Sequence, residues 1–143
     1  MKHTYLFEEG VWNASGIYVD ESGREFPVEG RANISHGVKT WKLSGGMRML
    51  TDSPIELQNT YEIESFEAGQ DCTKWSSHNS DIGELTGKFI VVHDSILSIY
   101  GTKNNEYEGT EYLKQINENT YQNCGALMKN DVRISSWAVE LKR

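Results

Sequence analysis

A turn signal recurs along the entire chain at intervals of roughly ten to thirteen residues. Each signal contains residues that tolerate positive φ or that hydrogen-bond their own backbone, which is why chains reverse there. Regular short spacing of this kind predicts many short strands, as in a β-sandwich or β-barrel. The signals are Asp20–Gly23, His36–Gly37, Asp52–Pro54, Ala68–Asp71, Asp81–Gly83, His93–Ser95, Lys103–Asn105, Asn117–Asn119 and Lys129–Asp131.

Between the turns, apolar and polar residues alternate with a period of two. Around Tyr61 the apolar set is Leu57, Tyr61 and Ile63, with Asn59 on the same face, and the intervening residues are mostly charged or polar. Phe89 stands in a similar pattern with Leu85 and Val91. Because successive side chains of a strand point to opposite faces, this pattern predicts antiparallel strands with one buried and one solvated face.

The pattern predicts about ten strands in one domain spanning residues 1–143. Residues 110–118 fit a helical period almost as well, although Gly109 favours a strand. We expect the first eight residues to form a short helical plug at one end. The predicted strands lie near 9–20, 24–35, 38–50, 56–67, 71–80, 84–93, 96–103, 106–117, 120–129 and 132–142.

We predict an all-β fold, an antiparallel up-and-down meander closed into a barrel. A flat sheet of ten strands would expose two edges and invite aggregation, so closure is favoured. Glycines inside the strands fit a barrel because they ease the bends that closure demands. A β-sandwich is the alternative, but the chain has no long connection of the Greek-key type.

The charge balance excludes several classes of partner. The formal net charge is −7 and Lys and Arg form no run, so we expect no nucleic acid and no anionic membrane surface as partners. No apolar run approaches the roughly 20 residues of a membrane helix. These features predict a cytoplasmic protein, monomeric or weakly dimeric, with Cys72 and Cys124 as reduced, buried thiols.

Gly10-Val11-Trp12, followed by Gly16-Ile17-Tyr18 and a turn with Asp20 and Gly23, resembles the opening of calycin barrels. Calycins include the lipocalins, fatty-acid-binding proteins and avidins. The resemblance implies an up-and-down barrel that binds a small molecule, with Trp12 packed across one end. The last strand ends in a basic residue, Arg143, as in many calycins. The chain lacks the helix pair of fatty-acid-binding proteins, the late helix of many lipocalins and the paired histidines of haem-binding ten-stranded relatives.

An inner face rich in aromatic residues predicts a ligand cavity, because side chains alone do not fill a barrel of about ten strands. Glu111 shares parity with Tyr107 and Leu113, which places it inside with Arg133 or Arg48 as its partner. Cys72 and His78 share a parity too, but six residues of strand span roughly 20 Å, so they cannot hold one metal ion. We expect no cofactor and no metal. His36 and His93, at strand ends, are expected to be solvated. The predicted ligand-binding residues are Trp41, Asn59, Tyr61, Trp75, His78, Phe89, Tyr100, Glu111, Tyr121, Asn123 and Arg133, with Ser76 and Trp137 also on expected inner faces.

The leading functional prediction is a barrel that binds a small hydrophobic or amphipathic ligand without catalysis. One alternative is an enzyme, of the isomerase, cyclase or hydrolase type, acting through His78 or Glu111 in the same cavity. Another is a structural or interaction module that pairs through a strand edge or a barrel face. The sequence contains no P-loop, Gly-x-Gly-x-x-Gly, His-Glu-x-x-His or Cys-x-x-Cys motif to decide among them.

Overall fold

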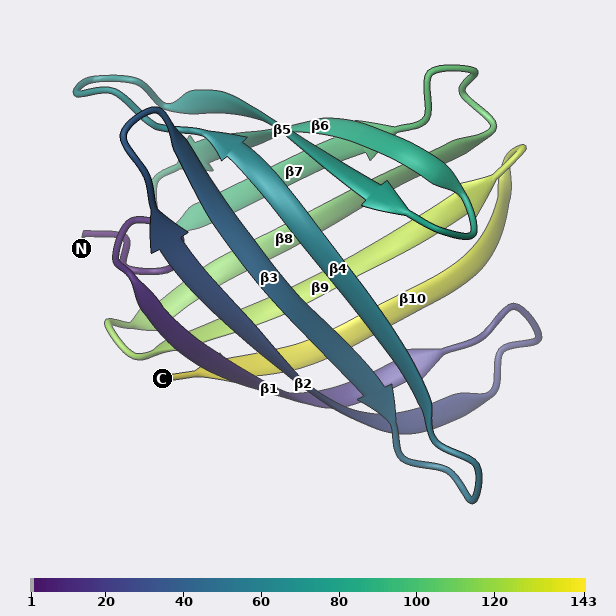
Figure 1. Cartoon of the computed structure of the whole chain (residues 1–143). Coiled ribbons are helices and arrows are strands. Elements are labelled where there is room, and N and C mark those ends of the chain that lie inside the picture. Colours follow the sequence, from purple (N-terminus) through teal and green to yellow (C-terminus); the bar gives the residue numbers. More distant parts are fainter. Residues whose placement is uncertain (1) are drawn as a thin grey trace.

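A computed structural model describes residues 2–143 as a closed barrel of ten antiparallel strands (Figure 1). Each predicted strand is found, with ends within about three residues of those expected, and the stretch 110–118 belongs to a strand. The described residues include no helix of the length and apolarity needed to cross a membrane. The strands are β1 (Gly10–Val19), β2 (Glu25–His36), β3 (Thr40–Met49), β4 (Ile55–Glu64), β5 (Cys72–Asn79), β6 (Gly83–Val92), β7 (Ser95–Gly101), β8 (Tyr107–Asn117), β9 (Thr120–Lys129) and β10 (Val132–Lys142).

Each strand pairs with its neighbours along the chain, and β1 pairs with β10 to close the barrel. This up-and-down order confirms the predicted meander and excludes the β-sandwich. The ladder is least continuous between β4 and β5, which share three residue pairs, from Tyr61–Ser77 to Ile63–Trp75. By comparison β3 and β4 share ten. Figure 1 shows β4 and β5 diverging toward the turn between β3 and β4.

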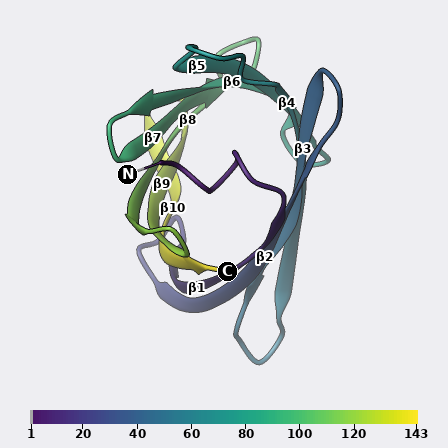
Figure 2. The same cartoon turned by 90° about the vertical axis from the view of Figure 1, so that its left-hand side faces the viewer.

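The N-terminal segment, residues 2–9, closes one end of the barrel. Figure 2 shows it crossing the interior close to the C-terminus. Leu6 is 0% exposed and Tyr5 is 6% exposed, so the segment is part of the core. The predicted plug is therefore present, but it is not a helix: a single backbone bond from Glu8 N–H to the Thr4 carbonyl marks one isolated turn. Met1, also within the predicted plug, lies outside the described residues.

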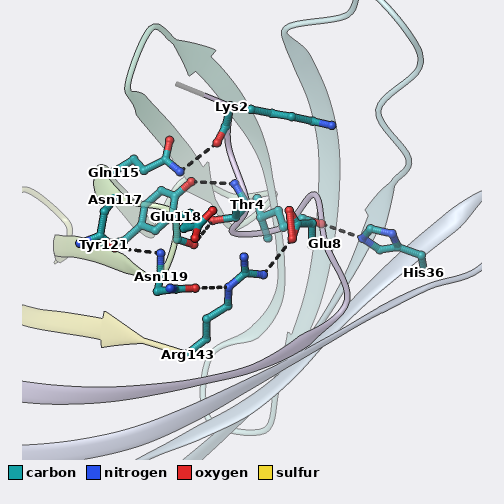
Figure 3. A network of polar contacts seen from close by, with 11 residues as sticks. Lys2, Thr4, Glu8, His36, Gln115, Asn117, Glu118, Asn119, Tyr121 and Arg143 are labelled. Atoms are coloured by element: carbon teal, nitrogen blue, oxygen red, sulfur yellow. Dashed lines mark hydrogen bonds and ion pairs between the residues drawn. The ribbon is translucent and has the colours of Figure 1, made fainter.

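Polar contacts hold this plug to the barrel (Figure 3). The Thr4 hydroxyl donates to the Glu118 carbonyl at 2.7 Å, and Gln115 Nε2 donates to the Lys2 carbonyl at 2.9 Å. His36 Nε2 donates to the Leu6 carbonyl at 2.7 Å. His36 also stacks on Trp41 with ring centroids 4.1 Å apart and is half-buried, so it is less solvated than predicted. A histidine at a strand end is expected to face water, but here the Leu6 carbonyl of the plug and the Trp41 ring occupy part of its surroundings.

His3 and Tyr121 form the centre of the plug contacts. His3 Nε2 lies 2.8 Å from the His93 carbonyl, which can only accept, so Nε2 carries a proton. In the neutral imidazole, Nδ1 then accepts from the Tyr121 hydroxyl at 2.7 Å. The same hydroxyl oxygen accepts from the Thr4 N–H at 3.1 Å. The donors and acceptors therefore match without an unpaired proton in this chain of contacts.

Trp12 lies beneath the plug and is 0% exposed. Its ring meets those of Tyr5 and Tyr121 edge-on, at centroid distances of 5.4 and 5.5 Å. The Arg143 guanidinium lies 5.3 Å from the Trp12 ring, within the range of a cation–π interaction. The first and last strands are thus joined across the plugged end, where the resemblance to calycins places a tryptophan.

Three inward-facing glycines make room for large rings in the barrel. A Cβ on Gly87 would lie 2.8 Å from the Trp75 ring, and one on Gly109 would lie 2.2 Å from the Tyr100 ring. Gly125 stands in the same relation to Trp137, its partner on the neighbouring strand, at 2.3 Å. An aromatic ring that covers a cross-strand glycine is a known device of curved sheets. Here it lets bulky rings stand on the inner face.

The phase of β5 corrects three predictions. Trp75 is 4% exposed and Ser77 is 6% exposed, so the odd positions of β5 face inward. Cys72, Ser76 and His78 therefore lie on the opposite face, and Cys72 and His78 are exposed. The physical reason is the pleat, because residues three apart cannot share a face and the larger apolar ring takes the interior. Cys124, on β9, is also exposed, so the predicted burial of both thiols is wrong.

Candidate functional site

Glu111 lies on the inner face of β8, near the middle of the barrel. Its neighbours across the two adjacent ladders are Ser98 of β7 and Gly125 of β9. Because inner-face partners continue from strand to strand, one row crosses half of the barrel wall. The row contains Phe89, Ser98, Glu111, Gly125 and Trp137.

The partner of Glu111 is an amide, not the predicted arginine. Asn123 Nδ2 donates to Glu111 Oε1 at 3.0 Å and to the Tyr112 carbonyl at 3.1 Å, which fixes the orientation of the amide. Arg133 pairs with Met128 next to a β-bulge, and its Nη2 donates to the Asp20 carbonyl at 3.1 Å. Arg48 is exposed. The predicted ion pair of Glu111 with either arginine is therefore wrong.

The surroundings of Glu111 disfavour its charge. Burial raises the pKa of the carboxyl from its ordinary value of 4.5 to about 7, and the hydrogen bond from Asn123 partly opposes this shift. Among residues 2–143 no protein donor reaches the second carboxylate oxygen, and no ion pair involves Glu111. The group can therefore gain or lose a proton near neutral pH.

Three phenols share the interior with this carboxyl. Tyr5 comes from the plug, Tyr61 from β4 and Tyr100 from β7. Burial raises the pKa of all three, and the negative charge of Glu111 raises each further, so all three lie near the carboxyl. Within the described residues, none of the three hydroxyls has a hydrogen-bond partner. Oxygen atoms from four separate segments thus converge on one region without pairing with the protein.

The interior is not completely filled at this point. Tyr61, Tyr100 and Glu111 stand on the inner face of a closed barrel, yet each retains partial accessible surface. Asn59, two residues before Tyr61 on the same face, is also half-buried. Accessible surface on inward-pointing side chains means that unoccupied space lies beside them. The lumen therefore has room next to its unpaired polar groups.

An aromatic wall borders this space. The Trp75 ring lies 5.0 Å from Tyr61, 5.3 Å from Tyr100 and 5.9 Å from Phe89, measured between centroids. Trp75 Nε1 donates to the Ser98 hydroxyl at 3.0 Å, so its polar edge is satisfied and its orientation is fixed. The lumen therefore combines a rigid apolar surface with a small number of polar groups, as ligand pockets do.

The structure separates the predicted site residues into three groups. Trp41 and Tyr121 belong to the plugged end, where their surroundings are the plug contacts described above. His78 lies on the outer face, and Arg133 is directed to the turn after β1. The residues that meet around the lumen are Asn59, Tyr61, Trp75, Phe89, Tyr100, Glu111 and Asn123.

Two residues of the lumen were missed by sequence reasoning. Tyr5 was assigned to the plug, and nothing in the local pattern shows that its hydroxyl points toward Glu111. Ser98 is 1% exposed and lies between Phe89 and Glu111 in the inner row. Its parity with Tyr100 on β7 is the signal that could have found it.

Two further concave regions lie on the outside of the barrel. One, of about 1220 Å³, is lined mainly by outward-facing residues of β4 to β9, among them Lys88, Ile99 and Met128. The other, of about 590 Å³, lies over β1 to β4 and β10 and is lined mainly by polar and charged residues. Residues 2–143 contain no group of three His, Cys, Asp or Glu side chains placed to hold a metal ion.

No protein-family model matches the chain, and no curated protein matches it in sequence. Among solved structures, the chain is similar to the S-type phycobiliprotein lyase CPES from Guillardia theta, with a TM-score of 0.67 at 7% identity over 95% of this chain and 88% of the lyase. It also matches a redesigned β-barrel, mFAP1, bound to DFHBI, with a TM-score of 0.47 at 12% identity over 97% of this chain and 96% of that one. The likeness to the lyase concerns the fold alone, and a ten-stranded up-and-down barrel fits the calycin-like fold.

Proposed function

We propose that the chain binds a small, partly apolar molecule in its lumen and does so without catalysis. One observation carries the proposal: a carboxyl oxygen and three phenols face unfilled space inside the barrel with no protein partner. A ligand in this space could supply the missing hydrogen-bond partners while it covers the aromatic wall beside them.

The aromatic wall supports an apolar portion of the ligand. Trp75 is held by Ser98 and packs against three other rings, so little further ordering is needed when a ligand arrives. A preformed surface of this kind lowers the entropic cost of binding. The ligand is therefore expected to be amphipathic, with its polar group toward Glu111.

Two measurements test the proposal directly. Native mass spectrometry of freshly purified protein should reveal retained small molecules, and a neutral lipophilic dye should gain fluorescence on titration. Asn59→Trp, which places an indole in the lumen, should lower dye affinity, whereas Thr60→Trp adds the same ring to the exposed face. Loss of binding only in Asn59→Trp supports the lumen. No retained molecule and no dye uptake, or equal loss in both variants, would contradict it.

The titration of Glu111 favours acid–base catalysis as a second candidate. A carboxyl with a pKa of about 7 is suited to give and take protons at neutral pH. The two functions differ in what happens to a bound molecule. If a molecule retained by the wild type is released unchanged after incubation, binding is supported. If it is converted by the wild type and not by Glu111→Gln, the catalytic alternative replaces it.

A further inference from the structure

We propose that the lumen selects molecules with a cationic nitrogen, such as a protonated aliphatic amine, seated between Glu111 and the aromatic wall. This inference rests on the proposed function, since it names the chemical class that the same lumen would accept.

Within the described residues, the negative charge of Glu111 has no positive counterpart. Arg133 donates through Nη2 to the Asp20 carbonyl at the turn after β1, its Nη1 is buried without a partner, and no ion pair joins it to Glu111. Lys129 lies 3.8 Å from Glu106 and 5.4 Å from the Tyr107 ring, close to the turn between β9 and β10. A buried charge is stable only when it is paired and hydrogen-bonded. A ligand cation would supply the pairing that the chain itself does not provide.

The rings beside the carboxyl favour the same class. The Tyr61 and Tyr100 rings lie 5.0 and 5.3 Å from the Trp75 ring, measured between centroids. The faces of aromatic rings carry negative electrostatic potential and attract ammonium groups, most strongly when water is excluded. A carboxylate next to such rings complements a positive charge and the methylene groups attached to it. An anionic head group would instead meet repulsion from Glu111.

Among residues 2–143, the titratable groups whose pKa values respond to the carboxyl are three tyrosines: Tyr5 from the plug, Tyr61 from β4 and Tyr100 from β7. The pKa of each is raised, so all three stay neutral near pH 7, and Asn123 from β9 does not titrate. Glu111 is therefore the group whose proton is coupled to binding. A bound cation lowers its pKa, so binding releases a proton, and affinity for an amine should fall by up to tenfold per pH unit below about pH 7.

Three probes with one alkyl chain separate head-group charge from apolar contact: octylamine, octanol and octanoate. The affinity of each probe is measured by its displacement of the neutral dye from the wild type, from Glu111→Gln and from Glu108→Gln. Glu108 is the matched control because it lies on the same strand with an exposed, outward side chain. Circular dichroism and urea unfolding confirm that both variants are folded.

We expect octylamine to bind the wild type most tightly and octanoate most weakly. Glu111→Gln should lose roughly 10- to 100-fold in affinity for octylamine, as expected for a charge-assisted hydrogen bond, and far less for octanol. Glu108→Gln should match the wild type. Calorimetry of octylamine binding at pH 7 in two buffers of different ionisation enthalpy should detect proton release in the wild type and none in Glu111→Gln.

The outcomes distinguish this inference from the function on which it rests. If octanol and the dye bind but octylamine is not preferred, or if both glutamine variants lose affinity equally, the cation selectivity is wrong and ligand binding stands. If neither the dye nor any of the three probes binds, both proposals fail. Tightest binding of octanoate would overturn the inference and point to a positive group in the lumen.

Discussion

The plugged end and the middle of the lumen are both buried, yet the hydrogen bonds of their polar groups differ. At the plugged end His3, Thr4 and Tyr121 form a chain of contacts in which each donor meets an acceptor. In the lumen Glu111 has one amide partner, and three phenols beside it have none. The contacts of His3, Thr4 and Tyr121 are closed within the protein, although Trp12 Nε1 and Gln115 Oε1 beside them are buried without a partner. The oxygens of the lumen instead face unoccupied space.

The two regions contribute differently to the stability and to the function of the barrel. The plug buries Leu6 and Trp12 completely and brings the two ends of the chain together through Arg143. Such packing favours a single closed state. The lumen accepts an electrostatic cost that a solely structural core would avoid, because an apolar residue at position 111 would be simpler to bury. Unpaired polar groups inside a stable frame are typical of binding sites.

The largest effect is expected at the plugged end. Trp12→Ala removes a fully buried ring together with its contacts to Tyr5, Tyr121 and Arg143. We expect a loss of about 3–5 kcal/mol in the free energy of unfolding, measured by urea denaturation. A loss below 1 kcal/mol would show that the plug is not the stabilising region of the barrel.

Glu111→Gln should raise the free energy of unfolding, whereas Trp12→Ala lowers it. A carboxyl whose pKa is higher in the folded state than in the unfolded state binds its proton more tightly when folded, so stability falls as the pH rises from about 4.5 to about 7 and then levels off. The variant lacks this loss and should be more stable than the wild type by about 3 kcal/mol at pH 8 and similar at pH 4. Urea unfolding across this range measures it. A parallel pH dependence in both proteins would contradict the raised pKa.

Ser98→Ala tests a polar group of the lumen that, unlike the three phenols, does have a partner in the protein. The change leaves the buried Trp75 Nε1–H without an acceptor. We expect a loss of about 1–3 kcal/mol in stability and a shifted tryptophan emission. Unchanged stability together with unchanged emission would mean that the indole is not held by this bond.

The smallest effect is expected on the outer face. His78→Ala alters an exposed residue of β5 and should change stability by less than about 0.5 kcal/mol. Dye binding should also be unchanged, because the side chain points away from the lumen. A clear loss of dye affinity would place the ligand on the outside of the barrel, where the larger groove lies between β4 and β9.

The strands and their order could be predicted because their signals are local. Turn residues such as those at 20–23 or 103–105 act over a few positions, and alternation around Tyr61 and Phe89 follows directly from the pleat. A meander needs no information beyond which neighbours are linked by hairpins. The closed barrel and most of its strand ends were therefore predictable from the chain alone.

The site was only partly predictable, because its chemistry depends on contacts between distant segments. Glu111 could be placed on an inner face, but its partner Asn123 and the phenol of Tyr5 come from other parts of the chain. The prediction for β5 was wrong because Trp75 and His78 were both assigned to the lumen, although residues three apart in a strand face opposite sides. Whether a buried polar group is satisfied is decided by residues far away in sequence.

By itself, the sequence determined an all-β chain of about ten alternating strands, since periodicity and turn chemistry are properties of short segments. Only the tertiary structure decided that the N-terminal segment closes one end and that one carboxyl oxygen and three phenols inside have no protein partner. The physical reason is that hydrogen-bond satisfaction and desolvation are collective, and they are settled only when strands distant in sequence close around the same space.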